Sequence, residues 1–231
     1  MVDKYNTAKI LTRHFKTTYS ERPLDNDDYN VDDHGWVELY SSAGAVRSFA
    51  TGKLPIKFKI AHYDFIVSGM GLKSLEGCPL VVQGDFHCED NQLTSLQYAP
   101  KETQNFDCSN NQLVSLKYCP PVLYELVCNK NLLTSLESCP PTNYIWATEN
   151  PFEHFRNTPA HVNTVVITWK PHLPLLGLLT VNEIQLINPD NGEKMKDVEL
   201  ILNKYTGQGK RALFDCQKDL EDAGFEENAR W

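Results

Sequence analysis

The feature that most constrains this chain is one motif written three times at a nearly fixed period. The stretches CEDNQLTSL, CSNNQLVSL and CNKNLLTSL begin at residues 88, 108 and 128. A single short unit of this kind cannot bury its own apolar face, so repetition predicts a stack of similar coils. We therefore predict a solenoid of about four to five repeats of about 20 residues over residues 63–157.

The aligned repeat reads F-x-C-x-x-N-x-L-x-S-L-x-x-x-P, and each column indicates a structural role. The alternation in F-x-C predicts a short strand with both side chains facing inward. The asparagine is expected to hydrogen-bond backbone where the chain leaves the strand, and the leucines to bury the next corner. The two inward columns are Phe65, Phe86, Phe106, Leu126, Trp146 and Val67, Cys88, Cys108, Cys128, Thr148. The asparagine column is Asn91, Asn111 and Asn131, with Met70 and Pro151 at the two ends.

This pattern resembles the leucine-rich repeat, L-x-L-x-x-N-x-L, of the short bacterial and bacteriophage type that carries N-Q-L-T-S-L. The tail, with W-K-P-H-L-P-L-L at 169–176 and N-K-Y-x-G-Q-G-K-R at 203–211, resembles the region that follows such repeats in tailed-phage proteins. The resemblance implies an α/β fold built on a leucine-rich-repeat solenoid, a phage origin, and a host protein as partner.

The flanks are expected to cap the solenoid, with residues 1–62 forming an N-terminal helix and strand cap and residues 158–231 a C-terminal α/β cap. In the first cap we predict a helix over 1–17, a loop over 21–34, and strands over 35–40, 46–49 and 56–60. In the second we predict a strand over 165–169, a short helix after it, and helices over 197–205 and 210–223. Residues 181–187 fit either a strand or a helix.

Composition narrows the class of protein. The seven cysteines are an odd number and no export signal precedes them, so reduced thiols are expected. No apolar run is long enough to span a membrane, and we expect a soluble cytoplasmic protein, in the host cytoplasm if it is phage-encoded. The net charge of −8 disfavours nucleic acid as a partner and favours a basic protein. Residues 63–157 hold 11 acids against five bases, so most of the charge lies in the repeats.

The cysteine and histidine positions predict no metal, no cofactor and no enzyme activity. Stacked sulfurs at 88, 108 and 128 could bind a metal ion, but no C-x-x-C pair and no histidine stands at ligand spacing. Small buried thiols that fill the core explain the column better. We find no set of catalytic residues.

Three sharper interpretations of the tail are possible. Gly207–Arg211 could hold an anion at a helix start, although a glycine turn between helices fits better. A helix-turn-helix could read DNA, but the second helix is too acidic. Cys216 could be the nucleophile of a cysteine-based ubiquitin ligase-like effector. The following acid is at the wrong spacing, however, and Cys216 is expected to pack beside Leu213 and Leu220.

Side chains that alternate with the inward columns are expected to form an exposed, acidic concave face, with Ile145 and Ala147 among them. The predicted partner-binding residues are Asp85, His87, Glu89, Asn105, Asp107, Tyr124, Glu125, Tyr144 and Glu149. The function predicted from this face is non-enzymatic protein–protein interaction, and the resemblance to phage proteins implies that binding inhibits a host defence or nucleic-acid-handling protein. The alternative is a structural virion or scaffold protein that forms a homo-oligomer, for which Trp231 is a candidate contact.

Overall fold

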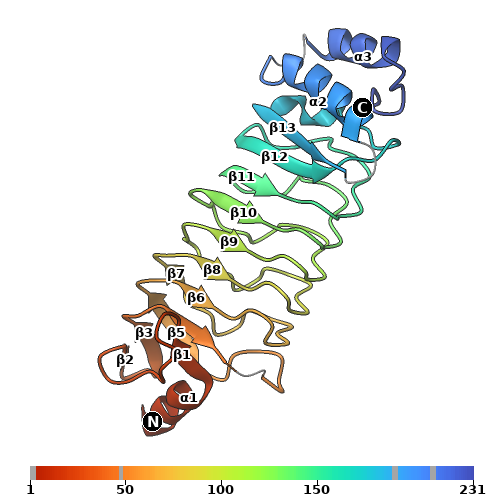
Figure 1. Cartoon of the computed structure of the whole chain (residues 1–231). Coiled ribbons are helices and arrows are strands. Elements are labelled where there is room, and N and C mark those ends of the chain that lie inside the picture. Colours follow the sequence, from red (N-terminus) through yellow and green to blue (C-terminus); the bar gives the residue numbers. More distant parts are fainter. Residues whose placement is uncertain (1–3, 47–48, 189–191, 209–211) are drawn as a thin grey trace.

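The chain forms an elongated β-solenoid of about eight turns, with the two termini at opposite ends of the stack (Figure 1). The computed structural model describes residues 4–46, 49–188, 192–208 and 212–231. The predicted solenoid is therefore confirmed, and it is longer than the four to five repeats expected. Within the described residues, no helix is long and apolar enough to cross a membrane.

A nine-stranded sheet runs the length of the molecule. Its strands, in spatial order, are β1 (Phe15–Thr17), β4 (Ala43–Ala45), β6 (Phe65–Ile66), β8 (Phe86–His87), β9 (Phe106–Asp107), β10 (Glu125–Val127), β11 (Thr142–Trp146), β12 (Val162–Thr168) and β13 (Glu183–Ile187). All neighbours are parallel except β1 and β4, because each coil passes the sheet in the same direction. The sheet passes without a break through the segments predicted as caps.

A second, four-stranded sheet closes the first coils. It contains β2 (Tyr29–Val31), β3 (Trp36–Leu39), β5 (Lys57–Ala61) and β7 (Val81–Val82). The core lies between the two sheets, where the rings of Phe58 on β5 and Phe65 on β6 meet edge to face at 4.9 Å. Phe65 also stacks on Phe86 of the next coil, with ring centroids 6.2 Å apart. The inward columns predicted for these coils are confirmed, and the cysteines of the second column are buried free thiols.

A ladder of buried asparagines holds consecutive coils together. Asn111 Oδ1 accepts a hydrogen bond from Leu93 N at 2.9 Å, and its Nδ2 donates to the carbonyl oxygens of Cys88 and Cys108. Asn91 and Asn131 repeat this arrangement one coil away on either side. Each amide therefore satisfies backbone groups of two coils, as the repeat predicted.

The last repeat is one residue shorter than predicted, and the alignment there is wrong. Leu126 pairs with Ile145 and Val127 with Trp146, so Ile145 faces the core and Trp146 faces outward. Asn150, and not Pro151, completes the asparagine ladder, since its Oδ1 accepts from Leu133 N at 3.1 Å. Ala147, expected outside, is also buried, and Thr148 takes the outward place.

The N-terminal unit departs from prediction in three places. Helix α1 covers Lys4–His14, and the residues after it form β1 instead of a further helical turn. Strand β2 lies inside the predicted loop. Strand β4 ends at Ala45, before the strand predicted over 46–49, of which residues 47–48 lie outside the described residues.

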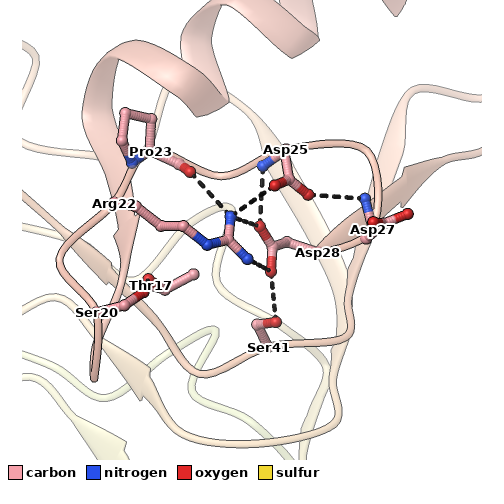
Figure 2. A network of polar contacts seen from close by, with 8 residues as sticks. All are labelled: Thr17, Ser20, Arg22, Pro23, Asp25, Asp27, Asp28 and Ser41. Atoms are coloured by element: carbon pink, nitrogen blue, oxygen red, sulfur yellow. Dashed lines mark hydrogen bonds and ion pairs between the residues drawn. The ribbon is translucent and has the colours of Figure 1, made fainter.

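Arg22 and Asp28 tie this unit together (Figure 2). Two guanidinium nitrogens of Arg22 donate to the two carboxylate oxygens of Asp28 at 2.6 and 2.9 Å. Ser41 Oγ and Asp25 N also donate to that carboxylate, at 2.6 and 2.9 Å. Burial raises the pKa of Asp28, but the hydrogen bonds from Arg22 and Ser41 lower it by more, to about 2.

The C-terminal end continues the sheet and then adds helices. Residues 181–187, ambiguous in the sequence, contain strand β13. A 3₁₀ helix covers Leu176–Thr180, and helices α2 (Gly192–Tyr205) and α3 (Ala212–Asp222) follow. The proposed anion loop extends over residues 209–211, outside the described residues. Cys216 is buried on α3, and burial raises its pKa to about 12, which is the opposite of what a nucleophilic thiol requires.

Candidate functional site

The outward side of strands β6, β8, β9, β10 and β11, which we call the strand face, carries three columns of side chains. Moving along the stack, the first column is Asp64, Asp85, Asn105, Glu125 and Tyr144, the second is Ile66, His87, Asp107, Val127 and Trp146, and the third is Ser68, Glu89, Ser109, Asn129 and Thr148. None of these described positions is a lysine or an arginine. The face therefore carries carboxylates with no lysine or arginine beside them in these columns, and His87 is the basic residue among them.

His87, Glu89 and Asp107 form the centre of the strand face. His87 and Glu89 are two residues apart on one coil and so point the same way, and His87 pairs with Asp107 across β8 and β9. His87 Nδ1 lies 3.7 Å from Glu89 Oε2, which is an ion-pair distance and too long for a hydrogen bond. The side chains of His87 and Glu89 are 33% and 26% exposed, so this cluster lies at the surface in a partly dry environment.

The pKa values of the three groups reflect that environment. The Glu89 carboxylate raises the pKa of His87 against the opposing effect of burial. Burial raises the pKa of Glu89, but His87 and Ser68 lower it by more, so the carboxylate stays ionised. Burial, aided by the charge of Glu89, raises the pKa of Asp107. Two acids against one histidine leave the cluster negative when the acids are ionised, even with the imidazole charged.

Four buried polar atoms on this face have no hydrogen-bond partner in the described structure: Ser68 Oγ, Glu89 Oε2, Ser109 Oγ and Trp146 Nε1. Ser68 is close enough to lower the pKa of Glu89, yet neither atom makes a hydrogen bond of acceptable geometry. A buried polar atom without a partner costs about 1–3 kcal/mol, so such atoms are uncommon without a reason. Each belongs to a residue that is itself only partly buried on the strand face.

The cluster could also hold a metal ion. One ligand atom from each of His87, Glu89 and Asp107 lies within 4.8 Å of the other two. A nitrogen and two carboxylate oxygens suit a borderline cation such as Zn²⁺. The expectation of no ligand set rested on spacing along the chain, whereas these three groups meet across two coils.

Two of the predicted partner-binding residues have a structural task. Asp85 Oδ1 accepts hydrogen bonds from Asn105 N and Nδ2, at 3.2 and 3.0 Å. Asn105 Oδ1 in turn accepts from Glu125 N at 3.0 Å. This first column therefore links coil to coil. Asp85, Asn105, Asp107 and Glu125 are half-buried and not exposed as expected.

The remaining predicted residues lie toward the edges of the face. Tyr124, which directly precedes β10, is 55% exposed, and Tyr144, in the first column on β11, is 43% exposed. Glu149 does not belong to the strand face: it lies on the following turn with φ of +54°, the place that Lys130 takes one coil earlier. Its carboxylate is 3.6 Å from Lys130 Nζ.

Sequence reasoning missed Trp146. Because this coil is one residue shorter than the others, alignment of the repeats placed the Trp146 ring in the core. The pairing of Val127 with Trp146 shows that the ring lies on the strand face. The nearby run Asn143-Tyr144-Ile145-Trp146 carries no glycine or proline that would mark the shift.

No family model, no curated protein and no solved structure matches this chain.

Proposed function

We propose that this protein is a non-enzymatic binding protein that holds a protein partner on the strand face. A cationic side chain of the partner would lie between Glu89 and Asp107, and polar groups beside it would satisfy the serines of the third column. The observation that carries the proposal is the lack of any lysine or arginine in the three columns around two neighbouring, partly desolvated carboxylates. Charge complementarity of this kind steers association and selects partners.

The resemblance to leucine-rich repeats of the bacteriophage type supports the same role. In that setting the partner would be a basic host protein, of a defence system or one that handles nucleic acid, and binding would inhibit it by occupying its anion-binding groove. A stack of parallel coils also supplies a stiff strand surface on which such contacts need little rearrangement.

The test is affinity capture from a lysate of the candidate host, with the doubly substituted Glu89→Gln/Asp107→Asn protein as the probe variant. These substitutions keep the size of each side chain and remove its charge. The matched control is Glu102→Gln/Glu137→Gln, which removes the same charge from exposed positions outside the strand face. We expect a basic protein to be retained by the wild type and the control and to be lost by the probe variant.

Varying the salt concentration and adding a chelator test which interaction holds the partner. Binding through exposed charges should weaken as salt is raised, because added ions screen the interaction. Repeating the capture with EDTA and with added Zn²⁺ shows whether the partner itself or a metal ion occupies the cluster. Equal capture by the probe variant and the wild type would contradict the proposal. Light scattering that finds a stable oligomer, with only copies of the chain captured, would favour the scaffold alternative.

A further inference from the structure

A pocket with a different chemistry lies beside the four-stranded sheet, where β3 and β5 meet the turns of the next coils. Its volume is about 440 Å³. The aromatic residues Trp36, Tyr98 and Tyr118 line it, together with Leu80 and the basic residue Lys57. This volume and this mostly apolar lining are typical of a site for a small organic ligand.

Tyr98 and Tyr118 hold a backbone conformation that large residues rarely adopt. Each is the third residue of a β-turn, closed by hydrogen bonds from Ala99 N to Leu96 O at 2.9 Å and from the equivalent Cys119 N at 3.0 Å. Their φ angles are +71° and +73°. Positive φ at this turn position is normally met by glycine, because a side chain there is strained.

The neighbouring coils show that the fold does not need tyrosine in these turns. In the coil before Tyr98 the same position is Gly77, with φ of +98°, where an added Cβ would lie 2.6 Å from Ile56 O. In the coil after Tyr118 the position is Ser138, which does not have a positive φ. The rings of Tyr98 and Tyr118 are also not part of the core, since the residues are 56% and 55% exposed. Backbone strain that supports no packing is a feature of functional positions.

The charges around the pocket are mainly positive, whereas the net charge of the protein is negative. Lys101 lines it alongside Lys57, whose Nζ lies 5.8 Å from the centre of the Trp36 ring. The one acid in the lining, Glu76, is neutralised by Lys53 at 2.8 Å. The pocket is thus a basic, aromatic region in a protein of net charge −8.

We propose that this pocket binds a small aromatic anion. The planar ring of the ligand would stack on Tyr98 and Tyr118, whose turns fix them in place. Its carboxylate, sulfonate or phosphate group would face Lys57 and Lys101. Aromatic stacking and the attraction of lysine for an anion each favour this class of ligand over a neutral apolar one. This site is independent of the strand face and of the partner proposed for it.

The first experiment is a fluorescence titration of the full chain with anilinonaphthalene sulfonate, an aromatic anion whose emission rises on binding. The uncharged N-phenylnaphthylamine serves as the comparison probe. We expect one saturable site for the anion, an affinity at least about tenfold above that for the uncharged probe, and weakening with salt. No saturable binding of the anion, or equal affinity for the two probes, would overturn the proposal.

Substitutions separate a binding role of the tyrosines from a role in the fold. The Tyr98→Gly/Tyr118→Gly variant should lose the anionic probe by at least about tenfold while its thermal midpoint stays the same or rises, because glycine relieves the strain at positive φ. Ser138→Gly, at the equivalent turn outside the pocket, should leave probe binding unchanged. A fall in the midpoint of the double glycine variant would mean that the rings stabilise the coil, which would contradict the argument from strain.

The lysines are tested by Lys57→Met/Lys101→Met, which keeps much of each apolar stem and removes the charge. Affinity for the anionic probe should fall toward that of N-phenylnaphthylamine, and the uncharged probe should bind as before. Unchanged affinity for the anion would overturn the assignment of its charged group to these two side chains.

Discussion

The central coils and the N-terminal unit solve the same problem, which is to pair polar groups inside the molecule, in different ways. In the coils a neutral asparagine amide pairs the buried backbone groups, and the asparagine ladder repeats the same hydrogen bonds from coil to coil. In the N-terminal unit a single charged pair does it, with Asp28 receiving hydrogen bonds from Arg22, Ser41 and the backbone of Asp25 (Figure 2).

This difference teaches where stability depends on conditions and where it does not. A neutral amide pairs equally well at any pH that leaves the backbone intact, whereas a carboxylate pairs with a guanidinium only while it is ionised. The contributions of the ladder asparagines to the free energy of unfolding are also additive, because each coil contacts only its neighbours. The charged pair is a single connection on which one unit depends. Each arrangement can be disrupted separately.

The largest effect is expected from Phe15→Ala in the N-terminal unit. Phe15 is fully buried, and its ring meets Phe58 edge to face at 5.1 Å. Its loss leaves a cavity between the two sheets and should lower the free energy of unfolding by about 4 kcal/mol in urea denaturation. Tyr19→Ala, at a residue that is 85% exposed, is the control and should change little.

Hydrogen exchange tests whether that damage stays local. Because coils contact only their neighbours, amides of the N-terminal unit should lose protection in Phe15→Ala while those of β9 and β10 keep theirs. Uniform loss of protection along the stack would show that the solenoid unfolds as one unit and that the contrast between the two regions does not extend to cooperativity.

The second substitution, Asn111→Ala, disrupts the asparagine ladder. Asn111→Ala removes an acceptor for Leu93 N and a donor for the carbonyls of Cys88 and Cys108, all inside the core. Leaving these groups unpaired should cost about 3 kcal/mol in the free energy of unfolding. The neighbouring Gln112→Ala changes an exposed side chain and should be nearly neutral. The loss in Asn111→Ala should be the same at pH 4 and pH 7, since no charge is involved.

The third prediction concerns pH. Asp28→Asn should lower the free energy of unfolding by about 2 kcal/mol at pH 7, because a buried, charge-assisted network loses its anion. The pKa of Asp28 is lowered from an ordinary 3.8 to about 2 in the folded protein. Its contribution is therefore fully present above the ordinary pKa and is lost as pH falls through about 2.

Urea denaturation across this pH range measures the effect. The difference between wild type and Asp28→Asn should shrink as the pH is lowered from 4 toward 2. Asp27→Asn, on an exposed neighbour, should give a curve parallel to that of the wild type. A difference that stays constant down to pH 2 would mean that the carboxylate charge is not what stabilises this unit.

The same contrast explains what the sequence could and could not predict. The ladder repeats in the sequence as it does in space, so the roles of Phe86, Cys108 and Asn131 follow from one alignment. The pairing of Arg22 with Ser41 through Asp28 occurs once and joins positions that no period relates, so nothing in the sequence indicates it. Strand β2 was missed because the acidic, turn-rich residues around Tyr29–Val31 indicate a loop, and its pairing with β3 makes it a strand.

The candidate site has features that the sequence predicts and features that it does not. The outward positions of His87, Glu89 and Asp107 follow from the two-residue period of a strand, and so their meeting on one face was predictable. The half-buried state of that face was not, because it depends on how closely successive coils approach. Trp146 was misplaced by a single missing residue, since a shift of one residue exchanges the two sides of a strand.

The smallest expected effect is a gain in stability, and it links the comparison to function. Asp107 is a half-buried carboxylate beside that of Glu89, and both burial and that neighbouring charge oppose its ionisation. Its Oδ1 accepts a hydrogen bond from Ser109 N at 2.9 Å, which the amide oxygen of asparagine can also accept. Asp107→Asn should therefore raise the free energy of unfolding by about 0.5 kcal/mol while weakening capture of a basic partner. Such a gain would support the proposal that the charge at this position serves binding of a partner and not the stability of the coil. Urea denaturation that finds Asp107→Asn less stable than the wild type would instead place this carboxylate among the groups that hold the coils together.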